Sequence, residues 1–218
     1  EIGTPTTCSS PNVHNPNLTY GSVTDQEGNV YKTIFIGARE WMAENLNTSI
    51  YRNGASIPTN LDDITWSSTT NGAWAYANNE PDNACPYGKL YNWYACMDSR
   101  GLCPTGWHIP SLDEWSTLAY ATDFAGIALK SVGTIQSGTG LWYESIISGS
   151  NNWGFSAIPG GIRNVNGSFG SIGYSGNYWS SSIGGPVYSL VLGYNDPYAF
   201  LYDNSMESEG LSVRCLRD

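Results

Sequence analysis

Apolar and polar positions near the start of the chain predict a β-hairpin. Val23-Thr24 and residues 30–36 form two short apolar-alternating runs around the turn-forming segment 25–29, which reads Asp-Gln-Glu-Gly-Asn. Two such runs around a glycine-containing turn are typical of paired antiparallel strands. Residues 40–46 and 88–95 carry large apolar side chains at closer spacing, and we expect a short helix in each.

The clearest helix signal follows Pro110. Ser111 and Glu114 have the S-x-x-E spacing of a capping box, in which each side chain accepts a backbone N–H of the first turn. The buried stripe of this helix is predicted to be formed by Leu112, Trp115, Leu118 and Ala119. A second helical stretch is expected over residues 125–130.

A second hairpin is predicted near the end of the chain. Residues 187–192 and 198–202 flank a turn at Asn195-Asp196-Pro197. Alternation places Leu190, Leu192 and Leu201 on one face, and the other face holds Ser189, Val191, Tyr198, Phe200 and Tyr202. If the leucine face is core, the second face presents aromatic rings to solvent, as binding surfaces do. The alternative is a sheet that is buried on both sides.

Charge is nearly absent from the segment that contains this hairpin. Between Ser145 and Asn195 the only charged side chain is Arg163, among 11 glycines, 11 serines and 8 aromatic residues. Disordered segments are poor in aromatics, so short strands joined by glycine turns are the better interpretation. With helices in the middle and strands at both ends, the chain is expected to form an α+β domain over residues 21–218. Residues 1–20 are expected to be a linker.

Overall composition excludes several classes of protein. The 218 residues include 19 acidic and 9 basic side chains, for a net charge of −10, and no lysine/arginine cluster, so a nucleic-acid partner is not expected. No run approaches the roughly 20 apolar residues of a membrane span. The segment from Gly3 to Asn17 is rich in Thr, Pro, Ser and Asn, as interdomain linkers are. We therefore expect an upstream anchoring or pilus-like domain, or a lipoprotein anchor.

The five cysteines favour disulfides over a metal site. No C-x-x-C pair occurs, so neither a metal nor another cofactor is expected. Cys85 with Cys96 would close a short loop, and Cys103 with Cys215 would tie the middle of the chain to its last strand. Cys8 is then left over, to pair elsewhere or stay free. Disulfides imply an oxidising, extracellular compartment. The alternative is five reduced cysteines in a cytosolic protein.

Several motifs, taken in order, resemble one family. They are residues 23–25, 28–33, 36–37, 41–46, 87–95, 103–104, 106–111, 114–115, 154–161, 163, 178–182 and 212–215. Together they resemble the major paralogous domain first noted in Fibrobacter succinogenes and abundant in surface proteins of Bacteroidetes. The stretch 88–115 also looks like C-type-lectin-like and formylglycine-generating-enzyme domains. The resemblance implies a C-type-lectin-like fold, with two main helices, small twisted antiparallel sheets and long irregular loops. Cys103 and Cys215 fall in family motifs, whereas Cys85 and Cys96 lie outside the usual pattern.

No catalytic constellation is visible, and we expect the protein not to be an enzyme. The reactive cysteine pair of formylglycine-generating enzymes is missing near the C-terminus, the histidines are only His14 and His108, and no Gly-x-Ser-x-Gly motif occurs.

The function expected instead is an extracellular, adhesin-like ligand-binding domain, with an unknown protein or glycan as its partner at a cell surface. Tyrosine, serine and glycine are the residues that antibody paratopes favour, and they dominate the C-terminal third. The candidate ligand-binding residues are Tyr174, Tyr178, Ile183, Val187, Ser189, Val191, Asp196, Tyr198, Phe200 and Tyr202. The resemblance to C-type-lectin-like domains further implies a variable protein diversified by a retroelement. The alternatives are a structural or assembly subunit of a surface complex and a carbohydrate-binding module.

Overall fold

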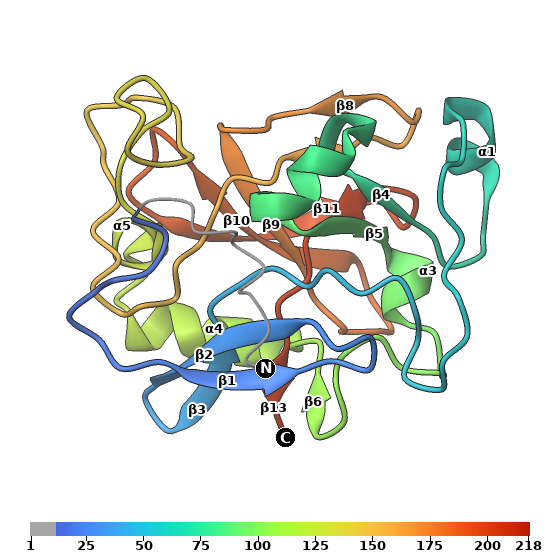
Figure 1. Cartoon of the computed structure of the whole chain (residues 1–218), viewed down its shortest axis with the longest axis horizontal. Coiled ribbons are helices and arrows are strands. Elements are labelled where there is room, and N and C mark those ends of the chain that lie inside the picture. Colours follow the sequence, from blue (N-terminus) through green and yellow to red (C-terminus); the bar gives the residue numbers. More distant parts are fainter. Residues whose placement is uncertain (1–11) are drawn as a thin grey trace.

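The computed structural model describes residues 12–218, and its first sheet joins the two ends of that range. Its strand order is β1-β2-β3-β13-β6, and all four pairings are antiparallel. The strands are β1 Gly21–Thr24, β2 Val30–Ile36, β3 Arg39–Met42, β6 Trp107–His108 and β13 Leu216–Arg217. The first predicted hairpin is therefore confirmed. Figure 1 shows β1, β2 and β3 at the bottom of the molecule, with β13 and β6 beside them.

The helix expected over residues 40–46 is wrong, because residues 40–42 form the end of β3 and residues 43–46 are not helical. Trp41 pairs with Ile34 on β2 and with Leu216 on β13, so this short strand has partners on both sides. A helix of seven residues is marginal without tertiary support, since few of its backbone hydrogen bonds offset the cost of nucleation. Two neighbouring strands supply the backbone partners instead.

Two further sheets complete the fold, as Figure 1 shows. A five-stranded sheet has the order β4-β5-β12-β7-β8, and a three-stranded sheet has the order β11-β10-β9. Their strands are β4 Trp74–Tyr76, β5 Lys89–Asn92, β7 Ile162–Arg163, β8 Phe169–Gly170, β9 Ser175–Trp179, β10 Val187–Gly193, β11 Ala199–Ser205 and β12 Gly210–Leu211. A parallel bridge between Tyr178 and Ser212 connects the two sheets. The second predicted hairpin corresponds to β10 and β11 and is confirmed.

The helices are few and short. The α-helices are α1 Asp63–Ser68, α2 Ala84–Tyr87, α3 Trp93–Cys96, α4 Leu112–Ala121 and α5 Gly126–Leu129, and the 3-10 turns are η1 Ala77–Asn79 and η2 Pro81–Asn83. Of the two main helices expected, only α4, with ten residues, is present as a long helix; α1 has six residues, and α5, within the helical stretch expected over residues 125–130, has four. The segment 88–95, expected to be helical, instead forms β5 and then enters α3. The described chain is thus a mixed α+β structure of mostly antiparallel sheets.

Local chemistry accounts for the position of α4. Ser111 and Glu114 make both hydrogen bonds of the predicted capping box. Trp115, Leu118 and Ala119 are buried as expected, whereas Leu112 is half-buried. The helix packs against β10 and β11, so its position fixes the back of the C-terminal hairpin.

An aromatic cluster fills the core between α4 and the sheets. The rings of Trp41 and Trp115 lie 5.1 Å apart, and Phe155 and Tyr178 complete the cluster. Tyr178, a candidate ligand-binding residue, is completely buried here, and its hydroxyl donates to the Ile158 carbonyl oxygen at 3.1 Å. Its inclusion in the binding face was therefore wrong, because it shares the inward face of the sheet with Leu190, its partner on β10.

One of the two expected disulfides is present as predicted. Cys103 and Cys215 are bonded, with their Cα atoms 6.0 Å apart. The expected Cys85–Cys96 pair is wrong: Cys96 is a free thiol buried in the apolar core beside α3, while Cys85 is itself disulfide-bonded. Cys8 lies outside the described residues.

The described part of the expected linker packs against the domain. Val13 is buried with Tyr87 and Ile158, and the His14 ring lies within hydrogen-bond distance of Ser156 and Glu44. Residues 12–20 therefore make specific contacts. Residues 1–11 of the expected linker lie outside the described residues.

Candidate functional site

The C-terminal hairpin has one apolar face and one face that carries both polar and apolar side chains. Leu190 and Leu192 on β10 are completely buried, and their neighbour Leu201 on β11 packs against the same core. The cross-strand pairs Val191–Phe200 and Ser189–Tyr202 alternate with these leucines on the ladder. Because successive strand residues point to opposite faces, these four side chains lie on the face opposite the leucines, where Ser189 is buried and Phe200 and Tyr202 are exposed.

Three aromatic side chains of this hairpin are exposed. Tyr198, Phe200 and Tyr202 expose 56%, 47% and 48% of their surface. Beside them lies an open hollow of about 550 Å³, to which Phe124, from the turn after α4, also contributes a side chain. Tyr120 and Phe124 are in edge-to-face contact at 4.9 Å, and both are exposed. Exposed aromatics from two separate segments thus lie along the outer edge of β11.

A separate pocket of about 220 Å³ opens on the same face of the sheet, and we call it the hairpin pocket. It lies where β9, β10 and β11 meet strands of the five-stranded sheet, and its lining residues are Ile162, Asn177, Ser189, Val191, Tyr202, Ser205, Glu209 and Leu211. Three of them, Ser189, Val191 and Tyr202, were candidate binding residues. The others come from β7, β9, the last residue of β11, the turn before β12 and β12 itself, which sequence periodicity does not bring together.

Polar groups of the hairpin pocket have defined partners. The Ser189 and Ser205 hydroxyls lie 2.9 Å apart, and both residues are buried. The side-chain nitrogen of Asn177 donates to the Gly161 carbonyl oxygen and to the Ser175 hydroxyl. Glu209 is half-buried, and one of its carboxylate oxygens accepts the Met206 N–H at 3.1 Å. Burial raises the pKa of the Glu209 carboxyl, and the Met206 hydrogen bond offsets part of that rise.

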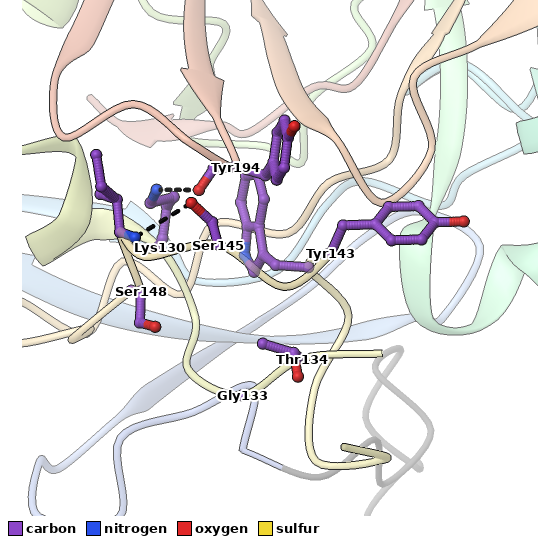
Figure 2. A pocket seen from close by; sticks show the side chains of 10 residues that line it. Lys130, Gly133, Thr134, Tyr143, Ser145, Ser148 and Tyr194 are labelled. Atoms are coloured by element: carbon purple, nitrogen blue, oxygen red, sulfur yellow. Dashed lines mark hydrogen bonds between the residues drawn. The ribbon is translucent and has the colours of Figure 1, made fainter. Parts of the chain in front are cut away.

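Lys130 holds the turn between β10 and β11. Its ammonium donates to the carbonyl oxygens of Gly193, Tyr194 and Asp196 at 2.9, 3.3 and 3.0 Å. Figure 2 shows Lys130 beside the Tyr194 carbonyl oxygen, with the Tyr143 ring pointing away. The residue is 1% exposed, and burial lowers the pKa of its amine to about 8, although the negative charge of Asp196 acts in the opposite direction. The small cavity drawn there, about 10 Å³, has room for a single water, so we interpret this cluster as a support for the turn.

The remaining candidate residues lie around this turn and on the preceding loop. Asp196 accepts the Tyr198 N–H at 2.8 Å and so shapes the approach to β11. Tyr174 is 44% exposed and stacks on Tyr143 with ring centres 4.2 Å apart. Ile183, on the loop between β9 and β10, is 74% exposed. Val187 is half-buried and packs against the main core cluster. The candidates other than Tyr178 thus extend from the turn, along the hairpin, to the loop before it.

Residues 12–218 hold neither a cluster suited to a metal ion nor a helix suited to a membrane. Within that range no group of three His, Cys, Asp or Glu side chains is arranged to hold a metal ion. His108 lies 2.6 Å from Asp218 and 3.0 Å from Glu114, where it connects β6 to the start of α4. No helix in the described part of the chain has the length and apolar character needed to cross a membrane.

These features define a disulfide-bonded α+β domain with an exposed aromatic hairpin. The chain belongs to the Fibrobacter succinogenes major domain family, whose match covers residues 34–217. The match includes α4, the two cysteines of the Cys103–Cys215 disulfide and the whole C-terminal hairpin. Neither the comparison with curated proteins nor that with solved structures found a match.

Proposed function

We propose that this chain is an extracellular, non-enzymatic ligand-binding domain of a bacterial surface protein, with an adhesin-like role. The observation that carries the proposal is the outward face of β10 and β11, where Tyr198, Phe200 and Tyr202 are about half exposed beside the hairpin pocket. Clustered, exposed aromatic side chains are costly to leave in water and are typical of interaction surfaces. The Cys103–Cys215 disulfide supports an oxidising, extracellular location.

A C-type-lectin-like arrangement is part of this proposal. In it, a scaffold holds long, irregular C-terminal loops whose side chains vary. The features that support it are the turn anchored by Lys130 and the completely buried Tyr178 on β9, which pairs with Leu190 on β10. Diversification of the hairpin by a retroelement fits this arrangement of a constant scaffold with variable loops. Its test is the gene neighbourhood: a near-identical template repeat and a reverse transcriptase are expected, and their absence contradicts this part.

The binding face is tested by removing its aromatic rings together. The variant Tyr198→Ala/Phe200→Ala/Tyr202→Ala is compared with the wild type on a glycan array and an array of secreted and surface proteins. We expect wild-type binding to at least one feature and a loss of at least tenfold in the variant. Thermal unfolding shows whether each variant is folded.

A matched control removes three apolar side chains elsewhere that are even more exposed. Phe35, Ile64 and Ile146 are 64%, 81% and 102% exposed and line neither the hairpin pocket nor the hollow beside β11. Their triple alanine variant should bind like the wild type. Equal binding by the hairpin variant and the wild type contradicts the proposed face, and binding confined to glycans identifies a carbohydrate-binding module.

An assembly role is the second candidate, and the open edge of β11 favours it. β11 is the outer strand of its sheet, and its first residue, Ala199, already pairs outward with the Phe124 carbonyl oxygen. An exposed strand edge is a place where another chain can add a strand. If the hairpin variant loses association with other subunits of its surface complex while array binding is unchanged, the assembly role is supported instead.

A further inference from the structure

The hairpin pocket contains a carboxylate that no cation balances. Glu209 lies half-buried on its wall, and no Lys, Arg or His among residues 12–218 forms an ion pair with it. One of its oxygens accepts the Met206 N–H. Burying a carboxylate without a positive partner is unfavourable, and here burial raises its pKa. A cation supplied from outside would remove that penalty.

The guanidinium on the neighbouring strand β7 is turned away from this carboxylate. Arg163 follows Ile162 on β7, and its side chain packs against Trp66 and Phe169, with guanidinium-to-ring distances of 4.2 and 4.9 Å. Gly210 directly follows Glu209, so a side chain at Gly210 would point to the opposite face of the chain. It would meet Trp66 and Arg163, and these two side chains therefore lie on the face opposite Glu209. The fold thus keeps Arg163 out of the pocket.

The other walls of the pocket are apolar or accept hydrogen bonds. Ile162, Val191 and Leu211 supply aliphatic surface, and Tyr202 supplies an aromatic ring. The side-chain nitrogen of Asn177 already donates to Gly161 and Ser175, so the side-chain oxygen of Asn177 is the atom left for a ligand. Ammonium groups are attracted both to carboxylates and to aromatic rings.

The size of the pocket and the net charge of the chain narrow the range of possible ligands further. A pocket of about 220 Å³ admits a chain of a few carbons with one polar end but excludes a drug-sized molecule. The chain carries a net charge of −10, which favours the approach of cations.

We propose that the hairpin pocket binds a primary ammonium group on a short aliphatic stem, with Glu209 as its counter-ion, as a lysine side chain of a partner protein would present it. This inference rests on the proposed ligand-binding function and names the ligand class for that site. The aliphatic stem lies against Ile162, Val191 and Leu211, and Tyr202 closes the outer side. A free alkylamine has the same chemistry, and the test separates it from a peptide.

The direct test is a titration of the isotope-labelled protein followed by NMR at pH 7.5. The probes are Nα-acetyl-lysine N-methylamide, its norleucine analogue without the amine, and n-butylamine. We expect saturable shifts of the amides of Asn177, Val191 and Tyr202 with the lysine probe, and at least fivefold weaker binding of the norleucine probe. Butylamine binding as tightly as the lysine probe assigns the pocket to free amines. Weaker butylamine binding assigns it to a peptide.

Two variants separate charge from shape. Glu209→Gln keeps the shape and removes the charge, and should weaken binding of the lysine probe at least fivefold. The control Glu144→Gln makes the same charge change at an exposed site outside the pocket and should leave binding unchanged. Affinity should also fall as the pH is lowered and Glu209 becomes protonated.

The outcomes distinguish this inference from the proposed function. No saturable shift with the lysine probe, equal binding of the norleucine probe, or unchanged binding by Glu209→Gln overturns the ammonium site. If the triple aromatic variant still loses array binding, the ligand-binding function stands without it. If the lysine probe binds but the triple variant keeps all array binding, the ammonium site exists and the proposed face is wrong.

Discussion

The disulfide between Cys103 and Cys215 should provide a large share of the stability of this domain. It joins residues separated by 112 positions, so it restricts a long loop in the unfolded chain. The loop-entropy relation gives about 5 kcal/mol at 25 °C for a loop of this length. Domains are typically stable by only about 5–15 kcal/mol, so loss of the bond should remove a third or more of the total.

The perturbation is the double variant Cys103→Ala/Cys215→Ala, measured by urea unfolding with circular dichroism at pH 7. Both residues are buried, so alanine also leaves two small cavities. Cys96→Ala is the matched control, because Cys96 is a buried cysteine with a free thiol in the same apolar cluster. It should cost about 1 kcal/mol and measures the truncation alone.

We expect the double variant to lose about 5 kcal/mol beyond twice the cost of Cys96→Ala. Its denaturant slope should also increase, because the unfolded chain without the closed loop exposes more surface. A double variant that loses no more than twice the Cys96→Ala cost, with an unchanged slope, would refute the reasoning and show that the bond adds little.

Three further predictions concern local stability. Ser111→Ala should lower the free energy of unfolding by about 1 kcal/mol in urea through loss of the capping box, whereas Ser116→Ala, inside the same helix, should not; equal effects would contradict the capping role. Burial raises the pKa of Tyr51 to about 12, so the folded protein is stabilised by the neutral phenol below pH 10 and should lose about 3 kcal/mol of that stability between pH 10 and 12. The variant Tyr51→Phe has no phenol to ionise, and its alkaline denaturation curve should lack this loss. Asp25→Ala removes the acceptor of two backbone N–H groups and of the Tyr31 hydroxyl, and calorimetry should show Tm lowered by roughly 6–12 °C, with an unchanged Tm contradicting this account.

The elements that the sequence predicted correctly depend on neighbours in the chain. The capping box at Ser111 and Glu114 and the turn at 25–29 are satisfied within a few residues, so their signals are complete in one short window. Alternation along 187–192 likewise predicted that Leu190 and Leu192 share a buried face. The Cys103–Cys215 pair was one of the pairings that the cysteine positions left open, and the family motifs supported it.

The misassigned elements depend on partners far along the chain. Residues 40–42 form a strand because β2 and β13 lie on either side of it, and residue 216 cannot be anticipated from a seven-residue window. Tyr178 looks like an exposed aromatic within its serine-rich segment, yet the core cluster surrounds it. Cys96 was paired with Cys85 on spacing alone, although its thiol faces the apolar core.

By itself, the sequence determined the family, the α+β class, the capped helix and the aromatic hairpin. Each of these follows from a local pattern or from motifs shared across the family. Only the tertiary structure decided that Glu209 and Ile162 join Tyr202 in one pocket and that Arg163 lies on the opposite face. The reason is physical: the backbone directs each side chain to one face of its own strand, but only the packing of β7 and β12 against the β9–β11 sheet decides which faces meet. The charge balance of the pocket, and with it the ligand that it favours, is therefore a property of the fold.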